Sequence, residues 1–248
     1  MGRWFWACSL VFLGLTAEYA KATPPPIAGI SVQSVTKGGA QVFVLDLDRV
    51  ELRTHLATSV GARKSTVQVL GPATHAIVAV NGGFFDERAR SLGLLVDRGI
   101  VLNPLRKADW GVFFVSKSSR RARLVHTRQW ASRARSSLPE FAIQAGPRLV
   151  VEGRPLSFKS QRARRTVLGI RPGGKEVVLV VFSQPILTAE LARQMMVPLG
   201  CTYALNLDGG SSTQLWSSMD SVASVRGIPV TNVVTVHPRI TADSSSNQ

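Results

Sequence analysis

Eight short and mostly apolar segments restrict the possible folds of this chain more than any other feature. Each is rich in Val, Leu, Ile or Phe, has the length of a β-strand, and is bounded by Gly, Pro, Asp or Ser. They are Gln41–Asp46, Val50–Ala57, Ile77–Val80, Leu92–Val96, Gly111–Ser116, Phe141–Gln144, Thr166–Ile170 and Glu176–Phe182. In the last of them, Val177–Phe182 is continuously apolar, which predicts a strand covered on both faces.

One helix is clearly indicated after these strands, with Thr188 as its cap and Gly200 as its end. Apolar residues repeat there at helical spacing. They are Leu191, Ala192, Met195, Met196 and Leu199. Tyr203–Leu207 then has the pattern of a strand, and Ser65–Leu70 that of a weaker helix. The predicted class is α/β in the mixed α+β sense: a single compact domain with a central mixed sheet and few helices.

The N-terminus has the layout of a secretory signal peptide over residues 1–22. The apolar run Trp4–Ala17 is shorter than the roughly 20 residues of a spanning helix, so we expect no stable membrane insertion after cleavage. An exported protein, periplasmic or secreted, is therefore predicted, with a folded domain over residues 23–240 and a loose tail over 241–248. Cleavage leaves Cys201 as the one cysteine, so the fold must be stabilised by its apolar core.

The chain is strongly basic, with a formal net charge of +15. Seven basic residues and no acidic one lie between Trp110 and Pro139, and a second cluster holds Lys159, Arg162, Arg164 and Arg165. Clusters of positive charge such as these attract polyanions. In an exported protein, anionic glycans or a phosphorylated substrate are better candidates than nucleic acid, and no nucleic-acid recognition motif is present. A basic face without a dedicated ligand is the alternative.

Two glycine doublets follow predicted strands and are accompanied by polar side chains. The first is Asn81-Gly82-Gly83 with Asp86, and the second is Asp208-Gly209-Gly210 followed by Ser211, Ser212 and Thr213. A strand that ends in two glycines can turn sharply and bring bare backbone N–H groups close to a ligand. The pair predicts a site for a phosphate or for sugar hydroxyls. Two tight turns whose Asn and Asp cap their own backbone remain the alternative.

Other chemistries are not supported by the motifs. The four histidines show no zinc-site spacing, and the chain has no nucleophile elbow, no P-loop and no Gly-x-Gly-x-x-Gly. Cys201 follows a predicted helix and is expected to be a buried apolar residue. No cofactor is predicted; a divalent cation at Asp208 and Asp86 is possible but not indicated.

The chain resembles the phosphodiester glycosidase family, the bacterial relatives of N-acetylglucosamine-1-phosphodiester alpha-N-acetylglucosaminidase. Ordered blocks from about Val42 to Val236 support the resemblance. They are Val80–Asp86, Gln144–Val150 with Gly153, Arg164–Ile170, Leu187–Thr213 and Arg226–Val236. One departure is Ser211, which stands where many members have a third glycine.

The resemblance implies hydrolysis of a sugar-1-phosphodiester at its glycosidic bond. Envelope or exopolysaccharide metabolism is the expected setting for an exported enzyme of this kind. It suggests Asp208 and Asp86 as catalytic carboxylates, with nucleophile and base unassigned and retention or inversion left open. A second group would bind phosphate or sugar hydroxyls. Its members are Asn81, Gly82, Gly83, Gln144, Arg165 with Arg164, Gly209, Gly210, Ser211, Ser212, Thr213 and Asn232. The alternative function is a non-catalytic binding protein for anionic envelope glycans.

Overall fold

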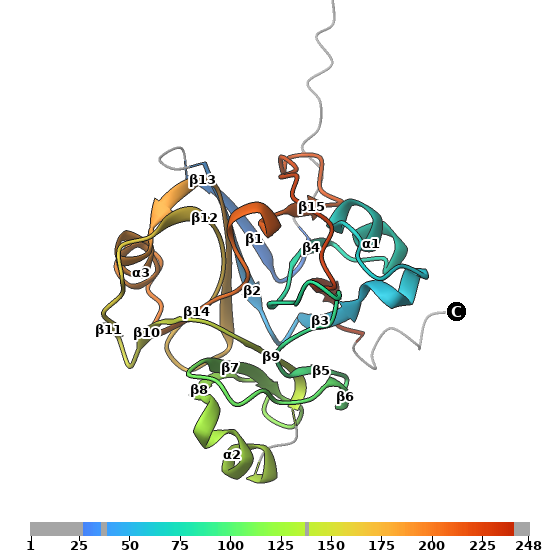
Figure 1. Ribbon diagram of the computed structural model, residues 1–248. Helices are drawn as coiled ribbons and strands as arrows, with labels where there is room; N and C mark the ends of the chain where they lie inside the picture. Colours follow the sequence, from blue (N-terminus) through green and yellow to red (C-terminus); the bar gives the residue numbers. More distant parts are fainter. Residues whose placement is uncertain (1–26, 36–38, 137–138, 241–248) are drawn as a thin grey trace, which may run out of the picture.

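The computed structural model describes residues 27–35, 39–136 and 139–240, and its strands form three sheets (Figure 1). The seven-stranded sheet has the spatial order β1 (Ile30–Val35), β2 (Ala40–Asp46), β13 (Glu176–Leu187), β12 (Arg162–Ile170), β14 (Tyr203–Asn206), β10 (Arg148–Val151) and β11 (Arg154–Pro155). The four-stranded sheet has the order β15 (Leu215–Ser217), β4 (Val78–Asn81), β16 (Asn232–Pro238) and β3 (Val50–Leu56). The five-stranded sheet has the order β6 (Ile100–Asn103), β5 (Leu95–Asp97), β9 (Pro139–Ala145), β7 (Gly111–Ser116) and β8 (Ala122–His126).

One apolar core lies between the inner faces of the three sheets. Phe43 and Leu179 enter it from the seven-stranded sheet, Val80 from the four-stranded sheet, and Phe113 and Phe141 from the five-stranded sheet. All five side chains are fully buried. Because side chains alternate along a strand, the residues between these positions face outward, and the apolar ones among them, such as Val42 and Val180, are buried by other elements.

Each outer face is covered by one short helix. α3 (Thr188–Met196) packs on the seven-stranded sheet, α1 (Val67–Ala73) on the four-stranded sheet, and α2 (Trp130–Ser136), through Trp130, on the five-stranded sheet. Strand β13 shows the result, since Leu179 faces the central core and Val180 faces α3. The prediction that Val177–Phe182 is buried on both faces is confirmed.

The predicted mixed α+β class is confirmed, but the strands pair differently from the expected central mixed sheet. Every pairing between named strands in the described residues is antiparallel. Strands β13 and β14, which α3 connects, run in the same direction, because β12 lies between them and is antiparallel to both. The strand–helix–strand unit therefore exists without a parallel pair.

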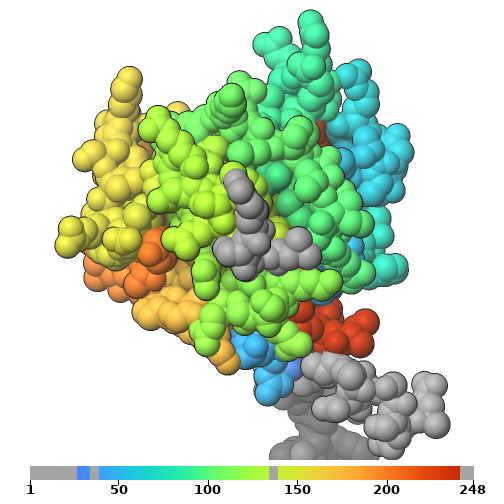
Figure 2. All heavy atoms as spheres, turned by 90° about the horizontal axis from the view of Figure 1, so that it is seen from below, coloured from blue at the N-terminus to red at the C-terminus, as the bar shows by residue number. Residues whose placement is uncertain are grey.

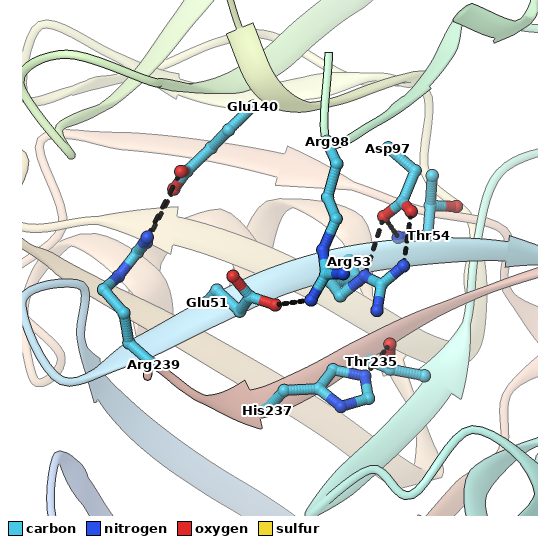
Figure 3. Close-up of polar contacts among 9 residues, drawn as sticks. All are labelled: Glu51, Arg53, Thr54, Asp97, Arg98, Glu140, Thr235, His237 and Arg239. Atoms are coloured by element: carbon cyan, nitrogen blue, oxygen red, sulfur yellow. Dashed lines mark hydrogen bonds and ion pairs between the residues drawn. The ribbon is translucent and has the colours of Figure 1, made fainter. Parts of the chain in front are cut away.

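Ion pairs join the four-stranded sheet to the five-stranded sheet (Figure 3). The Arg53 guanidinium holds Asp97 with two hydrogen bonds of 2.7 and 3.2 Å. Two further pairs are Arg98–Glu51 at 2.8 Å and Arg239–Glu140 at 2.6 Å. His237 lies beside this group, buried, with Nε2 2.8 Å from the Thr235 hydroxyl. These ion pairs thus connect the two sheets through side chains on their strands and on the residues just after them.

The expected signal peptide (1–22) and C-terminal tail (241–248) lie outside the described residues. In the part of the chain that is described, no helix combines the length and the apolar character needed to cross a membrane.

Candidate functional site

The two glycine doublets meet where the four-stranded and seven-stranded sheets approach each other. β4 ends at Asn81 and β14 ends at Asn206, and each strand leads into its own doublet. The Asp208 N–H donates to the Gly82 carbonyl at 3.1 Å, and the Asn81 side chain donates to the Asp208 carbonyl at 2.7 Å. Segments 127 residues apart therefore form one loop pair.

Asn81 is fully buried and organises this junction. Its Oδ1 accepts hydrogen bonds from the Thr166 hydroxyl at 2.6 Å and from the Gln214 N–H at 3.2 Å. Because Nδ2 is used by Asp208, both ends of the amide are engaged within the protein. The role of Asn81 in this structure is to hold the second doublet against the first.

Asn232 supports the first doublet from β16. Its Oδ1 accepts from the Gly83 N–H at 2.7 Å, and its Nδ2 donates to the hydroxyls of Ser91 and Thr231, both at 3.0 Å. A Cβ on Gly82 would lie 2.1 Å from Asn232 Oδ1, so this position accepts no side chain. The glycine is required by a close approach rather than by an unusual φ.

Gln144, at the end of β9, braces the loops beside the first doublet. Its Oε1 accepts from the N–H groups of Leu94 and Arg106, both at 3.0 Å, and its Nε2 donates to the Arg106 carbonyl at 2.8 Å. Its own carbonyl would meet a Cβ on Gly83 at 3.1 Å. The side-chain amides of Gln144, Asn81 and Asn232 are thus all hydrogen-bonded to other groups of the protein.

Asp208 is a partly buried carboxyl within the second doublet. Burial raises its pKa above the ordinary value, and hydrogen bonds from Ser212 and from the Gly209 N–H partly oppose this effect. The Gly209 N–H donates to Oδ1 at 2.9 Å. A raised pKa makes the ionised carboxylate a stronger base, which is a property that acid–base catalysis uses.

Arg165, from β12, lies against the second doublet and is 5% exposed. A Cβ on Gly209 would lie 3.6 Å from its Cδ and 3.7 Å from its Nη1. Nη2 donates to the Thr188 hydroxyl at 2.9 Å, while Nε is buried without a partner. Thr188 was expected to cap α3, but Leu187 is the N-cap and the Thr188 hydroxyl binds Arg165 instead.

No carboxylate among the described residues forms an ion pair with Arg165. Burial lowers the pKa of this guanidinium. A buried cation without a counter-ion is costly for the fold. The Thr213 hydroxyl and Asn206 Oδ1 are likewise buried without a partner. The region around the second doublet, at the ends of β12 and β14, therefore has buried polar atoms without hydrogen-bond partners and one positive charge without a counter-ion.

The remaining predicted residues have different surroundings. Arg164 donates to the carbonyls of Gly210, Ser211 and Arg226 at 3.0–3.3 Å, so it clamps the loop. Ser212 is buried and Ser211 is exposed. Gly210 has a φ of +62°, a left-handed conformation that suits glycine.

Asp86 lies on the loop after the first doublet and is paired with Arg90. Its oxygens accept from the Arg90 N–H at 2.9 Å and from Nε at 2.7 Å. The Arg90 N–H, and then its guanidinium, hold the pKa of Asp86 below its ordinary value. Asp86 and Asp208 thus have opposite pKa shifts.

Sequence reasoning did not single out Gln214 or Thr188 as partners of the site. Gln214 has no motif of its own and Thr188 was predicted as a helix cap, so only the tertiary contacts give them these roles. Among the described residues, no group of three His, Cys, Asp or Glu side chains has the arrangement of a metal site.

Three solved structures share this fold at low sequence identity. The catalytic domain of zebrafish N-acetylglucosamine-1-phosphodiester alpha-N-acetylglucosaminidase, auto-inhibited by its pro-peptide, has 16% identity and a TM-score of 0.64, with 85% of this chain and 82% of that chain covered. A hypothetical protein from Synechocystis has 16% identity and a TM-score of 0.59, with 85% and 61% covered. A putative exported protein from Burkholderia pseudomallei has 14% identity and a TM-score of 0.59, with 80% and 74% covered.

A search of curated protein sequences finds no significant match. The sequence profile of the phosphodiester glycosidases matches residues 74–237, which is more than half of the chain and includes both glycine doublets, Arg165 and Asn232. The chain therefore belongs to the phosphodiester glycosidase family.

Proposed function

We propose that the protein hydrolyses the glycosidic bond of a sugar-1-phosphodiester and releases a free sugar and a phosphomonoester. The observation that carries this proposal is the uncompensated Arg165 beside the Gly209–Gly210 loop. A guanidinium without a protein carboxylate, next to backbone without side chains, suits a phosphate group. Family membership supports the same class of substrate.

The proposed reaction needs one carboxylate that acts on water. Water adds its oxygen to the anomeric carbon, and the bond from that carbon to the phosphate oxygen breaks with its electron pair leaving on phosphate. Asp208 takes the proton of the attacking water, for which its raised pKa suits it. Arg165 stabilises the charge that develops on the departing phosphate.

Asp86 is proposed as the second carboxylate, which stabilises positive charge at the anomeric carbon. Its lowered pKa keeps it ionised, and its loop begins at the first doublet, where the Gly82 carbonyl accepts from the Asp208 N–H. Because Arg90 already neutralises part of its charge, we assign it the smaller effect. The three amides Asn81, Gln144 and Asn232 keep the loops in register, and this placement is their proposed contribution to substrate orientation.

We also propose that the protein acts after export, on envelope or extracellular polysaccharide. The predicted signal peptide at residues 1–22 supports export, as does the similarity to a protein described as a putative exported protein. A polysaccharide whose sugars are joined through an anomeric phosphodiester contains the carbon–oxygen bond that the proposed reaction cleaves.

The test is turnover by purified protein that begins at Thr23. A panel of sugar-1-phosphodiesters, including UDP-GlcNAc, is incubated with wild type and with Asp208→Asn, and products are identified by mass spectrometry. Release of free sugar and phosphomonoester by wild type, lost in a folded Asp208→Asn variant, supports the proposal. Sugar-phosphate products would contradict it. Tight binding of the panel without turnover would favour the glycan-binding alternative.

A further inference from the structure

A groove of about 500 Å³ lies away from the glycine doublets, at the other end of strands β12 and β14. Tyr203, which lines it, pairs with Ile170, whereas Asn206 at the doublet end pairs with Val167. Arg171 borders the groove and Arg165 borders the doublet, so six residues of extended chain, roughly 20 Å, separate the two places. The groove is therefore distinct from the candidate active site.

Three parts of the chain meet at this groove. Strand β8 and helix α2 form one wall, β10 and the residues after it form another, and the turn after β12 with the start of β14 closes the third side. Figure 2 looks onto the face where residues 120–135, in green, adjoin the yellow and orange segments that follow β9. Long-range folding thus creates the hollow from surfaces that are separate in sequence.

The lining of the groove is strongly cationic. It includes five arginines and one carboxylate, Glu152. The arginines are Arg121, Arg123, Arg133, Arg148 and Arg171. The basic segment between Trp110 and Pro139 supplies three of them, so the groove is where much of that excess charge is concentrated.

Several of these guanidinium groups are held in place by groups that do not cancel their charge. Arg121 donates to the Gly173 carbonyl, and Arg171 donates through Nε to the Leu199 carbonyl at 3.0 Å. The stem of Arg148 packs over Gly111, where a Cβ would lie 2.6 Å from its Cγ. Arg171 also has a longer contact of 3.4 Å with Glu176. Carbonyl oxygens orient a guanidinium without removing its net charge.

The shape and lining indicate the kind of anion. A hollow of this volume is in the range of sites for small ligands, so it suits a single phosphorylated sugar unit. Tyr203 is the one Phe, Trp or Tyr among the lining residues, which is a poor platform for stacking nucleic-acid bases. Gln129, Thr202 and Tyr203 add neutral polar groups that can hydrogen-bond sugar hydroxyls.

We propose that this groove is a second, non-catalytic site that binds a phosphorylated sugar unit of a polymeric substrate. The assignment of a glycan rests on the proposed function, while the assignment of phosphate rests on the arginines themselves. The site holds the polymer on the protein and does not contact the bond that is cleaved.

The experiment measures binding directly, so that it does not depend on turnover. Mature protein, from Thr23, is titrated by isothermal calorimetry with three ligands. They are a phosphorylated oligosaccharide of one defined length, the same oligosaccharide lacking phosphate, and a single-stranded oligonucleotide of equal charge. The test variant is Arg123→Gln with Arg148→Gln. The control is Arg128→Gln with Arg154→Gln, which removes the same charge from exposed residues outside the groove.

We expect the groove variant to bind the phosphorylated oligosaccharide at least 10-fold more weakly, with the control within twofold of wild type. The single variant Arg123→Gln, at an exposed strand position, is measured as well, so that the test does not depend on folding of the double variant. Equal binding by wild type and groove variants would overturn the proposal, as would equal binding of the unphosphorylated sugar or a preference for the oligonucleotide.

Small sugar-1-phosphodiesters separate this proposal from the proposed function. Groove variants are expected to keep wild-type kcat/KM on them, because the groove does not reach the cleaved bond. Absence of turnover in all proteins, with phosphate-dependent binding at the groove, would overturn the hydrolase and leave the second site standing.

Discussion

Burial of His237 is expected to make the fold sensitive to acid in a defined pH window. The imidazole is 8% exposed, at the end of β16 (Figure 3). Burial, and then the nearby His55 and Arg53, lower its pKa from 6.5 to about 4, while Glu51 acts in the opposite direction and Arg98 in the same one. Between these two pKa values, the unfolded chain binds a proton that the folded protein excludes.

The sign and size of the effect follow from proton linkage. The pKa of His237 is lower in the folded protein than in the unfolded chain. Its contribution to the free energy of unfolding is therefore fully present above the unfolded pKa of 6.5 and is lost as pH falls towards about 4. From pH 7 to pH 5, His237 alone should remove roughly 2 kcal/mol from the free energy of unfolding. The raised pKa of Asp208 acts with the opposite sign, since the folded carboxyl binds its proton first.

The assay is urea unfolding of wild type and His237→Gln at pH 5, 6 and 7, with tryptophan fluorescence as the signal. Glutamine does not titrate and can still hydrogen-bond Thr235. The loss of stability from pH 7 to pH 5 should be smaller by roughly 2 kcal/mol in the variant. Asp208 is present in both proteins, so its contribution cancels. The same loss in both proteins would refute the reasoning, whatever the absolute stability of the variant.

Three further predictions concern the candidate site. Asp208→Asn should reduce kcat/KM about 10³-fold and Asp86→Asn only about 10-fold, as initial-rate kinetics on one substrate will show; equal losses would contradict the separate roles. Arg165→Gln should lower kcat/KM about 10²-fold without lowering the melting temperature, because it removes an uncompensated buried cation. A large fall in melting temperature would instead make Arg165 structural. Gly82→Ala should destabilise the fold by at least about 2 kcal/mol in urea unfolding, because its Cβ would overlap Asn232.

The elements that sequence patterns predicted best are a clearly bounded apolar run and a helix with periodic apolar residues. β7 has the predicted bounds Gly111–Ser116, and the predicted helix after Thr188 is α3. Burial of Cys201 is confirmed, and burial raises the pKa of its thiol to about 12. Continuous apolar runs also predicted two-sided burial of β13, because both of its faces meet apolar layers.

The sequence patterns could not predict that the strands form three separate sheets. Strand pairing is decided by long-range contacts, and short strands such as β10 and β11 have little pattern of their own. β16 was part of a family-like block but was not predicted as a strand. Its pairing with both β3 and β4 places Asn232 beside Gly83.

The candidate site was predictable in part. The glycine doublets predicted a site because two glycines after a strand can bring bare backbone N–H groups close to a ligand, and the structure brings the two doublets into contact. The roles of the polar side chains were not predictable. Asn81, Gln144 and Asn232 are equally suited by chemistry to bind sugar or backbone, and only the structure shows that they bind backbone and neighbouring side chains.

The most direct test of the proposed reaction is hydrolysis of a sugar-1-phosphodiester in water enriched in oxygen-18. Attack at the anomeric carbon places the label in the free sugar and leaves the phosphomonoester unlabelled. Early time points are required, because a free sugar exchanges its anomeric oxygen with water whereas the phosphomonoester does not. An unlabelled phosphomonoester is the predicted result. Oxygen-18 in the phosphomonoester would mean that water attacks phosphorus, and it would contradict glycosidic cleavage at this site.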